Sequence, residues 1–93
     1  MERSEVSLHE VQVYRALKSH PDQWLTNKEI LGLAPGVKAR TVRAHTKRLV
    51  ALGIVDQAEV FPAHRYRWAI MADKRNPAYA LRLKQAEIVF GLG

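Results

Sequence analysis

Apolar residues recur at helical spacing in four segments of the chain, and the first of them begins close to the N-terminus. Ser7 and Glu10 have the separation at which a hydroxyl and a carboxylate satisfy each other's exposed backbone amides at a helix start. The apolar residues that follow keep helical spacing, and Pro21 prevents the helix from continuing. The pattern therefore predicts a helix over residues 8–19.

Thr26 and Glu29 repeat this capping pattern at the start of a second helix. That helix must end near Ala34, because the following Pro35-Gly36 favours a turn. Residues 23–25, between the first two helices, are expected to be extended. We expect Trp24, in this segment, to lie in the core.

The third helix, predicted over residues 38–52, has two different sides. At 100° per residue its apolar positions fall together, and His45 lies with them, so we expect this histidine to be partly buried. Gly53 follows where a left-handed residue commonly ends a helix. The opposite side of the helix carries Arg40, Arg43, Ala44 and Lys47.

Two segments with a strand pattern follow, over residues 54–60 and 65–70, joined by residues 61–64. This pattern predicts a β-hairpin. In the second strand, Tyr66 and Trp68 alternate with arginines. Such alternation in a small sheet favours a core position for the aromatic side chains over a stacking platform for nucleic-acid bases.

A last helix is predicted over residues 76–90, after a polar hinge at residues 72–76, because asparagine can cap it and proline suits its first position. It has two apolar stripes, although a helix packed on its own domain needs only one. We therefore expect a two-fold homodimer through this helix; the alternative is that the helix packs wholly on its own domain or that residues 89–93 fray. The candidate interface residues are Tyr79, Leu83, Ala86 and Phe90 on one stripe, and Leu81 and Ile88 on the other.

The composition fits one folded domain and removes several classes of chemistry. The chain has 93 residues, of which 47% are hydrophobic and 26% charged, with room for a single core. It has no cysteine, which excludes a disulfide framework, a thiolate zinc site and a thiol nucleophile. Its four histidines lack the spacing of a metal site, and its five glycines form no phosphate-binding loop. We therefore expect no metal, no cofactor and no enzymatic activity.

The charge of the chain points to a polyanionic partner. The net charge is +6 and the pI is near 10.1. Residues 36–53 contain no acid and five basic residues, namely Lys38, Arg40, Arg43, Lys47 and Arg48. Nucleic acid is the leading candidate, and an anionic membrane is the second. No segment reaches the roughly 18 consecutive apolar residues of a membrane span. The N-terminal residues lack the pattern of a secretory signal, so we expect a cytoplasmic, nucleoid-associated protein.

Three sequences within this order of elements resemble the winged helix-turn-helix family of DNA-binding domains, as found in bacterial-type transcriptional regulators: residues 24–30, 36–43 and 47–55. The most telling part is R-L-x-x-L-G-I-V, which ends the third helix directly before the hairpin. The resemblance implies an α+β, mostly helical fold with a three-helix core and a β-hairpin wing over residues 1–72. A C-terminal helix follows within residues 73–93.

The resemblance also implies where DNA would bind. Residues 27–34 would form the first helix of the motif, residues 38–52 the recognition helix in a major groove, and residues 61–65 the wing beside the adjacent groove or backbone. The planar guanidinium groups of Arg40 and Arg43 can each donate two hydrogen bonds to the N7 and O6 atoms of a guanine, and the small Ala44 leaves room for a thymine methyl. The expected DNA-binding residues are Thr26, Asn27, Lys28, Lys38, Arg40, Thr41, Arg43, Ala44, Lys47, Arg48, His64 and Arg65.

We therefore expect a sequence-specific protein that binds double-stranded DNA and regulates transcription. One alternative is a winged-helix adaptor whose basic helix docks on an acidic protein surface, because folds of this kind also serve as interaction modules. Another is RNA binding, in which no wide major groove admits the helix.

Overall fold

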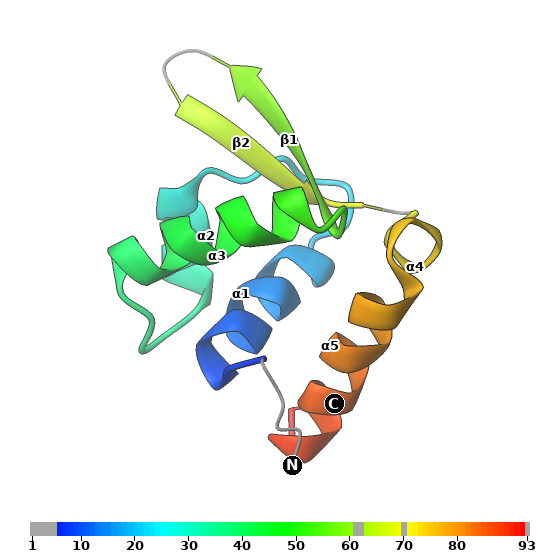
Figure 1. Cartoon of the computed structure of the whole chain (residues 1–93). Coiled ribbons are helices and arrows are strands. Elements are labelled where there is room, and N and C mark those ends of the chain that lie inside the picture. Colours follow the sequence, from blue (N-terminus) through cyan, green and yellow to red (C-terminus); the bar gives the residue numbers. More distant parts are fainter. Residues whose placement is uncertain (1–5, 61–62, 70, 93) are drawn as a thin grey trace.

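The computed structural model describes residues 6–60, 63–69 and 71–92, and these form an α+β arrangement that is mostly helical (Figure 1). The described residues contain five helices and one antiparallel hairpin. In chain order the elements are α1 (Leu8–Lys18), α2 (Asn27–Leu33), α3 (Ala39–Ala51), β1 (Val55–Val60), β2 (Ala63–Trp68), α4 (Ala72–Arg75) and α5 (Pro77–Val89). The four predicted helices are confirmed to within two residues at each end. The short α4 replaces most of the predicted polar hinge.

The two predicted capping boxes differ in the structure. At α2 both bonds form: the Glu29 amide donates to the Thr26 hydroxyl, and the Thr26 amide donates to the Glu29 carboxylate. At α1 the Glu10 amide donates to the Ser7 hydroxyl, but the Glu10 carboxylate points into the core. The reciprocal box predicted at α1 is therefore only half correct, because buried partners hold the carboxylate instead.

The hairpin is longer than predicted at its outer end. The register runs from Val55 opposite Trp68 to Val60 opposite Ala63. The prediction that residues 61–64 form the connection was therefore wrong at positions 63 and 64, which pair in β2. Residues 61 and 62 lie outside the described residues. Leu25 exchanges two backbone hydrogen bonds with Tyr66, which confirms the predicted extended segment before α2.

The core surrounds α1, which packs against α2, α3, β2 and α5. In Figure 1, α1 lies between α3 and α5, and the hairpin projects away from the helices. Leu17, Ile30, Leu49 and Leu83 come from these four helices and have no exposed surface. The C-terminal helix therefore contributes to the same core as the first three.

Gly53 makes the turn from α3 into the hairpin. Its φ of 80° lies in the left-handed region, as predicted from its position after the helix. A Cβ at this position would lie 3.3 Å from the Cβ of Arg75, so α4 also packs closely here.

Candidate nucleic-acid interface

The outer face of α3 is basic and its inner face is packed. Val42, Thr46 and Leu49 have no exposed surface, which confirms the predicted core side of the helix. The residues predicted on the other side are all exposed: Arg40, Arg43, Ala44 and Lys47. Lys38, which precedes the helix, is also exposed, and Thr41 is half-buried. We call Lys38, Arg40, Arg43 and Lys47 the basic face.

The charges of the basic face are not neutralised within the described part of the chain. No carboxylate oxygen described in the structure lies within 4 Å of any of its four cations. Many basic side chains elsewhere do have acidic partners: Arg15 and Lys18 pair with Glu87, Arg65 with Glu29, Arg67 and Arg75 with Asp56, and Lys84 with Asp73. The basic face is therefore the main concentration of uncompensated charge.

Helix α2 adds one more cation beside this face. Lys28 and Arg43 both line a shallow hollow between α2 and α3. Asn27 is used differently, because its Oδ1 accepts a 2.9 Å hydrogen bond from the buried Thr46 hydroxyl. Thr26 is occupied by its capping box with Glu29. Of the three residues predicted at the start of α2, Lys28 is thus the one that extends the basic face, whereas the other two fix the position of α2.

Arg48 lies at the edge of the basic face but turns toward the core. Its Nε is 3.6 Å from Oε1 of Glu10 and donates to the Tyr79 hydroxyl at 3.4 Å. The guanidinium also lies 5.7 Å from the centre of the Tyr79 ring. Arg48 therefore joins α3 to α1 and α5 in this structure.

His45, on the inner side of α3, is half-buried as predicted. Its Nδ1 lies 3.7 Å from the same Glu10 oxygen. Burial lowers the pKa of His45 below its usual value, and the nearby Glu10 opposes this effect only in part. Burial and the hydrogen bond to Glu10 raise the pKa of Tyr79 to about 12. At neutral pH both rings in this cluster are therefore uncharged.

The start of β2 carries two basic side chains, Arg65 and His64, that have acidic neighbours. Arg65 Nη1 lies 3.9 Å from Oε1 of Glu29, and His64 Nδ1 lies 3.7 Å from Oε2 of Glu59. His64 also contacts Gln57, with 2.9 Å between Nδ1 and Nε2. Both predicted wing residues are on the second strand near its start, but acidic side chains stand beside them. The wing is thus a weaker candidate for phosphate contact than α3.

Trp24 was predicted in the core, and this is wrong. Its ring is half-buried, and the guanidinium of Arg67 lies 4.4 Å from the ring centre. Nη2 of Arg67 also lies 3.9 Å from Oδ2 of Asp56. The long arginine covers the ring that we expected other apolar residues to cover. Tyr66 is buried and Trp68 packs against the core, as predicted.

The six candidate residues of the last helix fall into two groups. Tyr79, Leu83 and Ala86 are buried inside the chain's own core. Leu81, Ile88 and Phe90 are exposed, with 55%, 74% and 39% of their surface accessible. The first apolar stripe therefore packs in the core, apart from Phe90 at its end. The second stripe lies on the surface.

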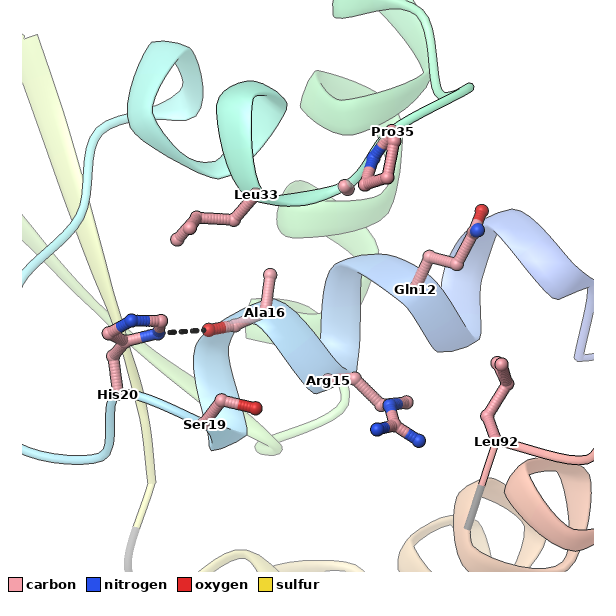
Figure 2. Close-up of a pocket in the computed structure, with 9 residues that line it drawn as sticks. Gln12, Arg15, Ala16, Ser19, His20, Leu33, Pro35 and Leu92 are labelled. Carbon is pink, nitrogen blue, oxygen red and sulfur yellow. Dashed lines mark hydrogen bonds between the residues drawn. The ribbon is translucent and has the colours of Figure 1, made fainter.

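A second hollow lies between α1, the turn after α2 and Leu92 (Figure 2). Its apolar wall includes Leu33 and Pro35. Two of its polar residues already have partners within the chain: Arg15 lies 3.8 Å from Glu87, and Nδ1 of His20 lies 3.0 Å from the Ala16 carbonyl oxygen. Arg15 of this hollow has an acidic neighbour, whereas the four cations of the basic face have none among the described residues.

Glu10 is the important residue that sequence reasoning missed. Its position three residues after Ser7 made it look like a capping residue, yet its side chain contacts two other helices. One feature of the sequence could have indicated this role: Glu10 is the one acidic residue of α1, and His45 was predicted on the inner side of α3. Charge complementarity between two helices could have suggested the pairing.

Comparisons with protein-family models, with curated proteins and with solved structures find no match to this chain. Within residues 6–60, 63–69 and 71–92, every helix is too short or too polar to cross a membrane.

Proposed function

We propose that this protein binds double-stranded DNA as a winged helix-turn-helix domain, with α3 as the recognition helix, and regulates transcription. The observation that carries the proposal is the basic face, whose four cations have no carboxylate partner among the described residues. Cations that neutralise DNA phosphates release the bound counterions, and this release favours binding. The major groove of B-form DNA is wide enough to hold a helix.

The residues of the basic face divide into two roles. Arg40 and Arg43 are one helical turn apart on the exposed side of α3, where their planar forks suit the N7 and O6 atoms of guanine. Ala44 beside them allows close approach to a thymine methyl. Lys38, Lys47 and Lys28 flank these residues and suit phosphates, which set affinity more than sequence preference.

The hairpin plays a secondary part in this proposal. The backbone bonds between Leu25 and Tyr66 attach β2 next to the start of α2. This places Arg65 close to Glu29, so any phosphate contact by Arg65 must compete with that carboxylate. The arginine therefore adds less to binding than a cation of α3.

Fluorescence anisotropy with labelled duplexes tests the proposed function. We expect binding to a DNA duplex that is tighter than binding to an RNA duplex of the same sequence. Each phosphate contact should contribute a slope of about −0.9 to a plot of log K against log salt concentration, so several cations give a steep slope. An adaptor that docks on an acidic protein would show neither tight duplex binding nor this slope.

We further propose a two-fold dimer through the exposed stripe of α5. Leu81 and Ile88 are seven residues apart and both project from the surface of the chain. In an antiparallel pairing about a two-fold axis midway between them, Leu81 meets the partner's Ile88, so the contact is self-complementary. A dimer would also place two copies of α3 on successive half-sites of DNA.

Sedimentation velocity tests the dimer. We expect the intact chain to sediment as a dimer at tens of micromolar, and Ile88→Glu to sediment as a monomer, because a charge would then be buried in the contact between the two copies. Leu33→Glu serves as the control, since it adds the same charge at an exposed leucine of α2. A monomeric wild type, both free and on DNA, would contradict the dimer.

A further inference from the structure

Glu10 is a buried carboxylate that three residues from two other helices approach. It is 2% exposed. One oxygen, Oε2, accepts a hydrogen bond from the Tyr79 hydroxyl of α5. The other oxygen, Oε1, lies 3.6 Å from Arg48 Nε and 3.7 Å from His45 Nδ1, both on α3. Two basic side chains of the same helix therefore share one oxygen.

This sharing makes the two basic side chains alternatives to each other. A buried carboxylate requires a compensating positive charge. At neutral pH the imidazole is uncharged, so Arg48 supplies that charge. Once protonated, His45 carries a charge 3.7 Å from the oxygen that Arg48 Nε approaches to 3.6 Å, and two cations then crowd one carboxylate. Two other titratable groups lie near His45. His9 of α1 disfavours protonation of the His45 ring, and the Tyr79 hydroxyl donates a hydrogen bond to Glu10.

Of the two basic side chains, Arg48 is the one that can move away from Glu10 toward solvent. Its side chain is 48% exposed, whereas that of His45 is 19% exposed. Its contacts to Glu10 and to the Tyr79 hydroxyl, at 3.6 and 3.4 Å, are long for charged hydrogen bonds. It follows Lys47 directly, at the edge of the basic face. Mutual repulsion will therefore move the arginine outward rather than the histidine.

We propose that protonation of His45 releases Arg48 from Glu10 to a DNA phosphate, so that the protein binds duplexes more tightly as the pH falls. The proposal rests on the proposed function, because the released arginine needs a phosphate to contact. It makes His45 a positioning residue that acts through Arg48, and it links α5 to the basic face through the Tyr79 hydroxyl.

The first test uses the free protein and no DNA. NMR titration from about pH 8 to about pH 5 should show the Arg48 Nε–H resonance moving with the same midpoint as the His45 ring, and that midpoint should lie below the usual histidine value because burial lowers the pKa of His45. In His45→Gln that movement should disappear. An Arg48 resonance that does not follow the histidine, or that still moves in His45→Gln, would overturn the release.

The second test measures duplex binding at both ends of this pH range. We expect the salt slope of the chain to become steeper by about one at low pH, because one more phosphate is neutralised. Measurements are made in a His64→Gln background, so that protonation of the exposed histidine on β2 does not contribute. Both His45→Gln and Arg48→Gln should lose the change in slope, and circular dichroism at each pH should confirm that they are folded.

The outcomes separate this proposal from the proposed function. Duplex binding with a slope that does not change with pH, or a change that persists in either variant, would overturn the switch and leave the DNA-binding function intact. Absence of duplex binding at both pH values would overturn the DNA-binding function, and with it the phosphate contact, whereas the NMR titration would still decide whether His45 displaces Arg48.

Discussion

Leu83→Ala should lower the free energy of unfolding by about 2–5 kcal/mol, because it removes a fully buried side chain and leaves a cavity. Leu83 lies on α5 and has no exposed surface. It packs in the same core as the residues of α1, so the cavity would open between the last helix and the rest of the chain. A loss of this size would be a large part of the stability of a small domain.

Urea unfolding followed by tryptophan fluorescence measures this loss. The matched control is Leu81→Ala, the same change on the same helix at a side chain that is 55% exposed. At protein concentrations low enough to keep the chain monomeric, the control should change stability by well under half as much. Equal effects of the two replacements would mean that α5 is not part of the core.

Arg43→Ala should weaken binding to a preferred duplex by about 1–3 kcal/mol and relax the preference at one base pair, because a bidentate contact to a base is lost. Lys47→Ala should instead weaken binding to all duplexes alike and flatten the salt slope by about one. The two residues are both exposed on α3, and neither has a carboxylate partner among the described residues. The contrast therefore separates base recognition from phosphate contact.

Anisotropy with a duplex selected from a random library, and with an unselected duplex, gives both comparisons. Lys74→Ala is the control, since Lys74 is an exposed lysine of α4 outside the basic face. It should leave both duplexes nearly unaffected. If Arg43→Ala reduces binding to the selected and unselected duplexes equally, Arg43 does not read a base.

The features predicted correctly depend on residues that are close together in the chain. The capping box of Thr26 and Glu29 joins residues three apart, and Gly53 ends α3 through its own φ. The division of α3 into a core side and a basic side follows from helix geometry alone, once the helix forms. The alternation of aromatic residues and arginines in β2 predicted a strand, and β2 does pair with β1 in the structure. The candidate site on α3 was therefore visible in the sequence.

The features that were missed depend on packing between distant segments. Trp24 is a large aromatic residue of the kind found in cores, but an arginine from β2 covers its ring. Arg65 has the position of a wing cation, but the attachment of β2 to the segment before α2 brings Glu29 beside it. Such neighbours cannot be read from local spacing, because they depend on which elements pack together.

The sequence by itself determined the helices other than α4, the presence of the hairpin and the exposed cations of α3, because each of these depends on contacts within a few residues. Only the tertiary structure decided which stripe of α5 enters the core and what the Glu10 carboxylate binds. Glu10 and Tyr79 are 69 residues apart, and they meet only because α5 packs against α1. A polar side chain at a helix start has several low-energy partners nearby, and burial of the whole core selects one that lies far away in the chain.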